Sequence, residues 1–127
     1  VPLIPTASKD PIFAMQIGEV GHIPPPSEED LTHQYGKYRS QPTAMDLSHD
    51  GRMIVVLTHK HAYLYTRQSN ASWADVINRP ATMVTLPLPQ DLKDFSQREA
   101  ICFAPGGYDL LVTSEGLGAG LYRLHVR

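Results

Sequence analysis

The sequence is short of cysteine, of long apolar runs and of positive charge. Its 127 residues contain one cysteine, Cys102, which excludes an internal disulfide and a cysteine-based zinc site. The longest aliphatic run, from Ile54 to Leu57, is far too short to span a bilayer. Eleven basic and thirteen acidic residues give a formal net charge of −2, so the composition favours neither nucleic acid nor an anionic membrane as a partner.

Proline and glycine are abundant instead. Eleven prolines and nine glycines predict a chain with many turns and few long helices. A hydrophobic fraction of 42% is enough for a core, which argues against disorder along the whole chain. A length of 127 residues is that of one ordinary domain.

The first 42 residues contain a short apolar stretch followed by a long polar one. Residues 12–17 alternate between faces, with Phe13, Met15 and Ile17 on one of them, and this pattern predicts a strand. Residues 18–42 include three consecutive prolines, which lack backbone donors and cannot pair in a central strand. We expect a long surface loop there. Its acidic run at residues 27–30 is interpreted as solvated, with a partner-binding loop or a calcium site as alternatives.

From residue 43 onward the pattern is that of short strands joined by turns. Ser72 followed by Asp75 resembles a capping box, which predicts one helical turn around Trp73. The predicted strands cover residues 43–48, 52–58, 62–67, 81–86, 99–104, 109–113 and 121–126.

The second half of the chain repeats the first. Ala44 and Gly51 recur as Ala100 and Gly107 at a constant spacing. In each half, one face of the first strand is bulky and the other is small. In the strand over residues 43–48, the bulky face has Met45 and Leu47, and the small face has Ala44, Asp46 and Ser48. In the strand over residues 99–104, the bulky face has Ile101 and Phe103, and the small face has Ala100, Cys102 and Ala104. Such a strand is expected between two neighbouring sheets, where a large layer meets a small one to reach close packing.

Five segments resemble a known family. Residues 43–52 and 99–107 resemble the first hairpin of bacterial β-propeller blades, and residues 62–65 and 120–124 resemble the third strand. Residues 113–116 resemble the end of the second strand in lactonase-like and esterase-like-phytase-like propellers. The resemblance implies an all-β fold, a partial β-propeller of about two to three four-stranded antiparallel blades.

This resemblance divides the chain into three parts. Residues 1–42 would end a preceding blade, residues 43–98 would form one blade, and residues 99–127 a second, incomplete blade. Because a closed propeller needs about 4–8 blades, we expect the chain to be part of a longer protein or to assemble with further copies. The expected partner is a protein or another copy, bound through the open edges. The resemblance favours a periplasmic or extracellular location.

Three residues are candidates for binding a ligand: Thr43, Glu99 and Glu115. By the resemblance, Glu99 takes the place of a glutamate in the signature of calcium-dependent lactonases, and Glu115 ends the neighbouring strand. Carboxylates that converge suit a calcium ion, so Ca²⁺ is the one cofactor considered, with Glu99 and Glu115 as its ligands. The alternative is that Glu99 is a solvated strand end and Glu115 a turn residue.

Two functional hypotheses follow, and a purely structural role inside a larger surface protein is a third possibility. The first is a non-catalytic interaction or ligand-binding segment of a propeller, for which we assign no catalytic residue. The alternative is a segment of a calcium-dependent hydrolase acting on lactones or phosphate esters, in which the metal would polarise the substrate or activate water.

The remaining candidates favour ordinary structural roles. His59 and His61 would share a face on a strand, a geometry used for zinc, but a solvated turn is the simpler interpretation. Cys102 is expected to be a small core residue. Three aromatic side chains are expected to pack in the core rather than to stack on bases: Tyr63, Tyr65 and Trp73.

Overall fold

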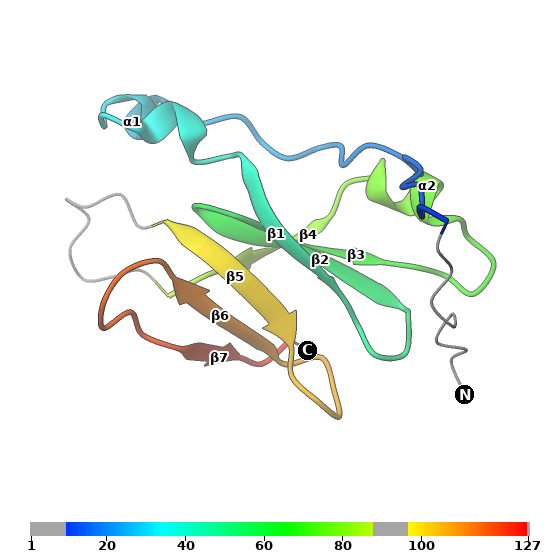
Figure 1. Cartoon of the computed structure of the whole chain (residues 1–127). Coiled ribbons are helices and arrows are strands. Elements are labelled where there is room, and N and C mark those ends of the chain that lie inside the picture. The colour runs from blue at the N-terminus through cyan, green and yellow to red at the C-terminus, as the bar shows by residue number, and fades with distance from the viewer. Residues whose placement is uncertain (1–9, 88–96, 127) are drawn as a thin grey trace.

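A computed structural model of the chain describes residues 10–87 and 97–126, which form two antiparallel sheets with few helices (Figure 1). Sheet A has the order β1-β2-β3-β4, and sheet B has the order β5-β6-β7. The strands are β1 (Pro42–Leu47), β2 (Met53–Thr58), β3 (His61–Thr66), β4 (Thr82–Thr85), β5 (Arg98–Phe103), β6 (Leu110–Ser114) and β7 (Tyr122–Leu124). The helical elements are α1 (Glu28–Leu31), the 3-10 turn η1 (Gly36–Tyr38) and α2 (Trp73–Ile77).

The all-β prediction is confirmed, and a strand forms within or across each segment predicted from residue 43 onward. The helical turn around Trp73 is also present, since the Ser72 side chain accepts a hydrogen bond from the backbone of Asp75. Predictions for residues 1–9 and 88–96 lie outside the described residues.

The segment before β1 differs from expectation in two ways. Residues 12–17 form no strand, because no described strand runs beside them to accept their backbone hydrogen bonds. The predicted loop over residues 18–42 contains α1 and η1. Helix α1 begins at a capping box, in which Ser27 and Asp30 each bond the other's backbone N–H, at 3.1 and 2.9 Å.

Sheet A is buried on both faces. Along β2, successive side chains point to opposite sides of the sheet. Val55 and Leu57 face sheet B, whereas Ile54 and Val56 face α2 and the chain around Val20, and all four of these β2 residues are at most 6% exposed. This double burial explains why β2 is apolar at consecutive positions rather than at alternate ones.

Sheet B is buried on one face. Leu110 and Val112 pack toward sheet A and are at most 2% exposed. On the opposite face, Ala100 and Cys102 are exposed. The expectation that Cys102 is a core residue is therefore wrong, because no described element covers the face of β5 on which it lies. The aromatic predictions hold, since Tyr63 and Tyr65 are buried beneath α2 and Trp73 packs beside them.

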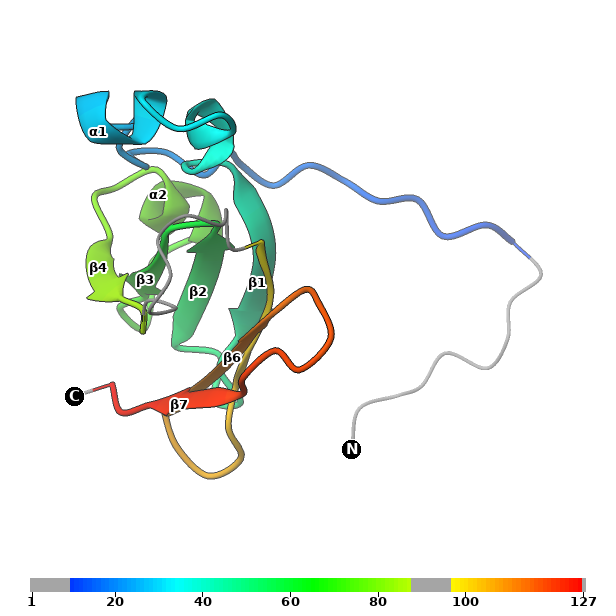
Figure 2. The same cartoon turned by 90° about the vertical axis from the view of Figure 1, so that its left-hand side faces the viewer.

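The two sheets meet through their first strands, β1 and β5, which lie side by side (Figure 2). Ala44 of β1 packs into the core between the sheets, and Ile101 and Phe103 of β5 enter it from the other side. The bulky face of β5 thus packs on the small face of β1. This is the packing that the repeated bulky and small faces predict.

Candidate functional site

The three predicted ligand-binding residues lie at the same end of the two sheets, where β1 and β5 begin and β6 ends; we call this end the shared edge. The Thr43 hydroxyl donates a hydrogen bond of 2.7 Å to the carbonyl oxygen of Arg98, the residue before Glu99. The backbone N–H of Glu115 donates to the carbonyl of Gln97 at 2.8 Å. Glu99 and Glu115 are exposed and Thr43 is half-buried. Both carboxylates are therefore accessible to a ligand, and Thr43 also helps to join the sheets.

A second inter-sheet bond lies further along the same strands. The Asp46 carboxylate accepts the backbone N–H of Phe103 at 2.8 Å. Along β5, every second residue forms backbone hydrogen bonds with β6, and the N–H groups of the residues between them point away from β6. Phe103 is one of the residues whose N–H points away. Asp46 thus satisfies a donor on the edge of the neighbouring sheet. The sequence pattern indicates only that Asp46 belongs to the small face of its strand.

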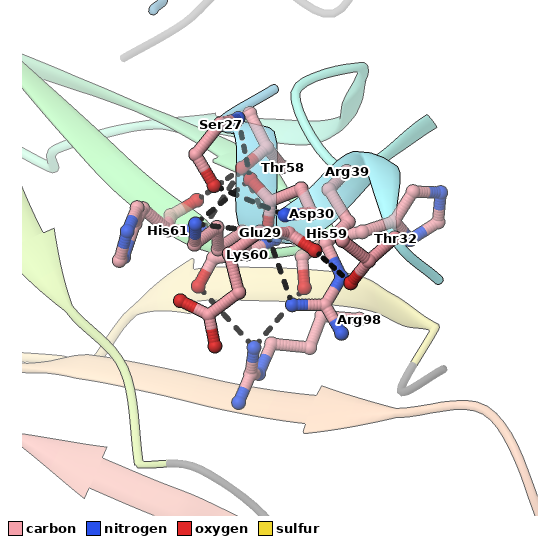
Figure 3. Close-up of polar contacts among 10 residues, drawn as sticks. All are labelled: Ser27, Glu29, Asp30, Thr32, Arg39, Thr58, His59, Lys60, His61 and Arg98. Atoms are coloured by element: carbon pink, nitrogen blue, oxygen red, sulfur yellow. Dashed lines mark hydrogen bonds and ion pairs between the residues drawn. The ribbon is translucent and has the colours of Figure 1, made fainter. Parts of the chain in front are cut away.

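Asp30 is the centre of the charged cluster above this edge (Figure 3). Its side chain is 3% exposed and lies 2.8 Å from the Lys60 ammonium group and 3.2 Å from Arg39. Burial alone would raise the pKa of this carboxyl, but hydrogen bonds from Lys60 and Ser27 outweigh burial and lower the pKa to about 2. The acidic run is therefore not simply solvated, because its last residue fastens α1 to the turn between β2 and β3.

Arg98 fastens the same turn from the side of sheet B. It is 5% exposed, and its guanidinium donates to the carbonyl oxygens of His59 and Lys60 at 3.0 and 3.3 Å, and also to that of Pro87. Burial, and then the neighbouring Arg39, lower the pKa of Arg98. A buried guanidinium that meets several carbonyl groups holds two sheets in one arrangement. Sequence patterns gave no indication of this role, because Arg98 stands at the end of a polar connection, just before the strand predicted over residues 99–104.

His59 lies in this turn and His61 is the first residue of β3, and both are half-buried. Burial lowers the pKa of both imidazoles, and Lys60 and Arg98 lower that of His61 further. They are not simply solvated, as the sequence interpretation had it. Within residues 10–87 and 97–126, no three His, Cys, Asp or Glu side chains are grouped so that they could hold a metal ion. Neither the zinc interpretation nor the predicted calcium pair gains a third ligand from the described residues.

A further contact joins the two hairpin turns at the opposite edge. The Tyr108 hydroxyl donates a short hydrogen bond to the Asp50 carboxylate, beside a surface hollow of about 320 Å³ that His49 and Gly106 also line. Gly51 and Gly106 take positive φ values of 70° and 82° in these turns. The sequence match pairs Gly51 with Gly107, so the two turns differ by one position.

A scan against models of known protein families finds no match, and searches of curated proteins and of solved structures find none either. Among the described residues, no helix has the length and apolar character needed to cross a membrane.

Proposed function

We propose that this chain is a segment of a β-propeller, two consecutive blades that serve as a non-catalytic interaction or ligand-binding module in a larger or oligomeric ring. The packing of β1 against β5 is the observation that carries this proposal. The two strands come from the repeated halves, and the bulky face of one lies on the small face of the other. Repeated units stacked in one direction leave a different unpartnered face at each end.

The exposed face of β1 is bulky and the exposed face of β5 is small, like the two strand faces that pack against each other between the sheets. On sheet A, Met45 and Leu47 lie on the face away from sheet B and are 57% and 48% exposed. On sheet B, Ala100 and Cys102 form the exposed small surface. A further sheet against Ala100 and Cys102 of sheet B would repeat the internal packing, which supports assembly with another blade or another copy. On sheet A, α2 already covers this face over β2 and β3, so only the strip of β1 with Met45 and Leu47 is open to a neighbour.

The proposed ligand surface is the shared edge with Thr43, Glu99 and Glu115. Asp30, Lys60 and Arg98 give this edge a fixed framework through buried ion pairs and hydrogen bonds. The exposed carboxylates of Glu99 and Glu115 lie beside that framework. Rigid support below exposed charged groups is the arrangement that binding surfaces use.

Light scattering over a range of protein concentrations tests the assembly. We expect a mass that is a multiple of 14.1 kDa and that falls toward 14.1 kDa in the double variant Met45→Asp with Leu47→Asp. The matched control is Leu117→Asp, an exposed leucine in the β6–β7 turn, and its mass should not change. A mass of 14.1 kDa for the parent chain at every concentration contradicts assembly through this face.

Calcium titration separates the module from the hydrolase alternative. For the module, Tm is expected to stay constant as calcium is added. A rise in Tm that disappears in Glu99→Gln but persists in Glu28→Gln, an exposed control, would instead favour the hydrolase.

A further inference from the structure

Sheet B ends in β7, one edge of which has no neighbour among the described strands. Sheet A has four strands, whereas sheet B has three, and β7 pairs with β6 alone among the described strands. The outer edge of β7 therefore presents backbone groups to no described partner. Such an edge is a template for a further strand.

A hollow of about 280 Å³ opens beside this edge. Leu64 and Val84 line it from sheet A, on the face turned toward sheet B. His125 and Val126, which follow β7, line it from the other side. A strand added to β7 would run over this hollow and could place apolar side chains against Leu64 and Val84.

The chain also carries an exposed apolar segment that packs on no described strand. Residues 12–17 are extended, and Phe13, Met15 and Ile17, which alternate along them, are 85%, 81% and 58% exposed. Figure 2 shows this part of the chain running away from the two sheets. Large apolar side chains gathered in this way mark an interaction site.

This segment starts on the wrong side of its own molecule to reach β7. A Cβ atom at Gly18 would lie 3.0 Å from the side chain of Ile77, so residue 18 is held against α2. Helix α2 packs on the face of sheet A that points away from sheet B. Six extended residues span about 20 Å at most, and sheet A stands in the way. A second copy has no such obstacle.

We propose that residues 12–17 of one copy add to the free edge of β7 in a second copy and form the fourth strand of its sheet B. Phe13, Met15 and Ile17 would face the hollow, and backbone hydrogen bonds along β7 would hold the strand. Because each copy carries one donor segment and one acceptor edge, two copies can exchange segments or several can close a ring. This inference rests on the proposed interaction role and names the partner.

Substitutions within the segment test the exchange without touching the folded core. In light scattering, Phe13→Asp with Met15→Asp should lower the mass at least twofold. The matched control, Ala14→Asp with Gln16→Asp, places the same charges on the opposite face and should keep the assembled mass. Equal masses for both variants and the parent chain overturn the strand exchange.

Cross-linking tests the face directly. In a Cys102→Ala background, one protein carries Gln16→Cys or Ala14→Cys and the other carries Arg123→Cys, whose side chain lies on the outer face of sheet B. Mixing and oxidation should give a disulfide-linked dimer. Met15→Cys mixed with Arg123→Cys should give less, because these side chains point to opposite faces. Absence of a dimer from both outer-face pairs, in variants with unchanged circular dichroism, overturns the proposal.

The proposals for the two assembly surfaces can be tested independently of each other. If Met45→Asp with Leu47→Asp lowers the mass and the segment variant does not, the proposed stacking of sheets stands and the exchange is wrong. If the segment variant alone lowers it, the exchange stands and stacking between copies through β1 is wrong.

Discussion

Sheet A and sheet B have similar strands in a similar order, but the chain covers them to different extents. Sheet A has four strands, with α2 and the chain around Val20 on the face away from sheet B. Sheet B has three strands, and its outer face carries the exposed Cys102. Equivalent positions in a repeat can therefore make very different contributions to stability. The contribution depends on which neighbour covers them, not on the strand alone.

The largest difference is expected between a tyrosine in the third strand of sheet A and a tyrosine in the third strand of sheet B. Tyr65 of β3 is 2% exposed and its hydroxyl donates to the carbonyl oxygen of Gly21 at 3.0 Å, whereas Tyr122 of β7 is 40% exposed. Tyr65→Ala should lower the free energy of unfolding by about 4 kcal/mol, in line with buried aromatic truncations, and Tyr122→Ala by about 1 kcal/mol. Urea denaturation measures both. Equal losses of unfolding free energy in the two variants would contradict this prediction, because they would mean that both sheets are equally covered.

The next largest effect is expected at Asp30. Asp30→Asn removes the buried charge that pairs with Lys60 and Arg39, and should cost about 2 kcal/mol at pH 7. The control is Glu29→Gln, on an exposed neighbour in α1, which should change stability by less than about 0.5 kcal/mol. Similar losses in the two variants would mean that the ion pairs do not fasten α1 to sheet A.

The same carboxyl predicts a dependence on pH. Its pKa is about 2 in the folded protein and 3.8 in the reference state, so its stabilisation is complete above pH 3.8 and is lost as the pH falls toward 2. Denaturation measured at pH 5 and at pH 2.5 should show a smaller difference for Asp30→Asn than for the parent chain. An unchanged difference would contradict the low pKa.

A smaller effect is expected where the sheets meet. Asp46→Ala removes the acceptor of the Phe103 N–H and should cost about 1.5 kcal/mol. The neighbouring exposed Met45→Ala should change stability by less than about 0.5 kcal/mol in the same urea titration. If the two changes cost the same, the carboxylate does not join the sheets.

The smallest effect is expected from the histidines of the β2–β3 turn. The pKa of His59 and that of His61 are both lowered, chiefly by burial, so the folded state favours the neutral imidazoles. Their contribution to stability is complete above pH 6.5 and declines as the pH falls below it. His61→Gln should flatten the stability profile between pH 7 and pH 5, while the exposed His33→Gln should leave it unchanged. A parallel profile for both variants would show that His61 titrates as in the unfolded chain.

The strands could be predicted from the sequence because their signals are local. Alternation in β1 and β5, and glycines such as Gly51 that allow positive φ, mark hairpins without knowledge of the neighbours. A ligand-binding role for Thr43, Glu99 and Glu115 comes from the repeat and its family resemblance, and it stays a prediction. These features depend on residues close together in the chain.

Other features depend on contacts between distant residues, and they could not be predicted. Asp30 in an acidic run looks solvated until the fold brings Lys60 to it. Arg98 looks like an ordinary strand end until the carbonyls of the β2–β3 turn surround it. Cys102 looks like a core residue because local alternation shows that a face is small but not whether another sheet covers it.

Amide hydrogen exchange at low and high protein concentration tests the central claim, that sheet B lacks a covering strand which another copy supplies. Exchange in β2 and β3 is expected to be slow at both concentrations. Residues 12–17 and 122–124 should exchange rapidly in dilute protein and become protected together as the concentration rises. Exchange in these two segments that is slow in dilute protein, or that stays rapid at every concentration, would contradict the account.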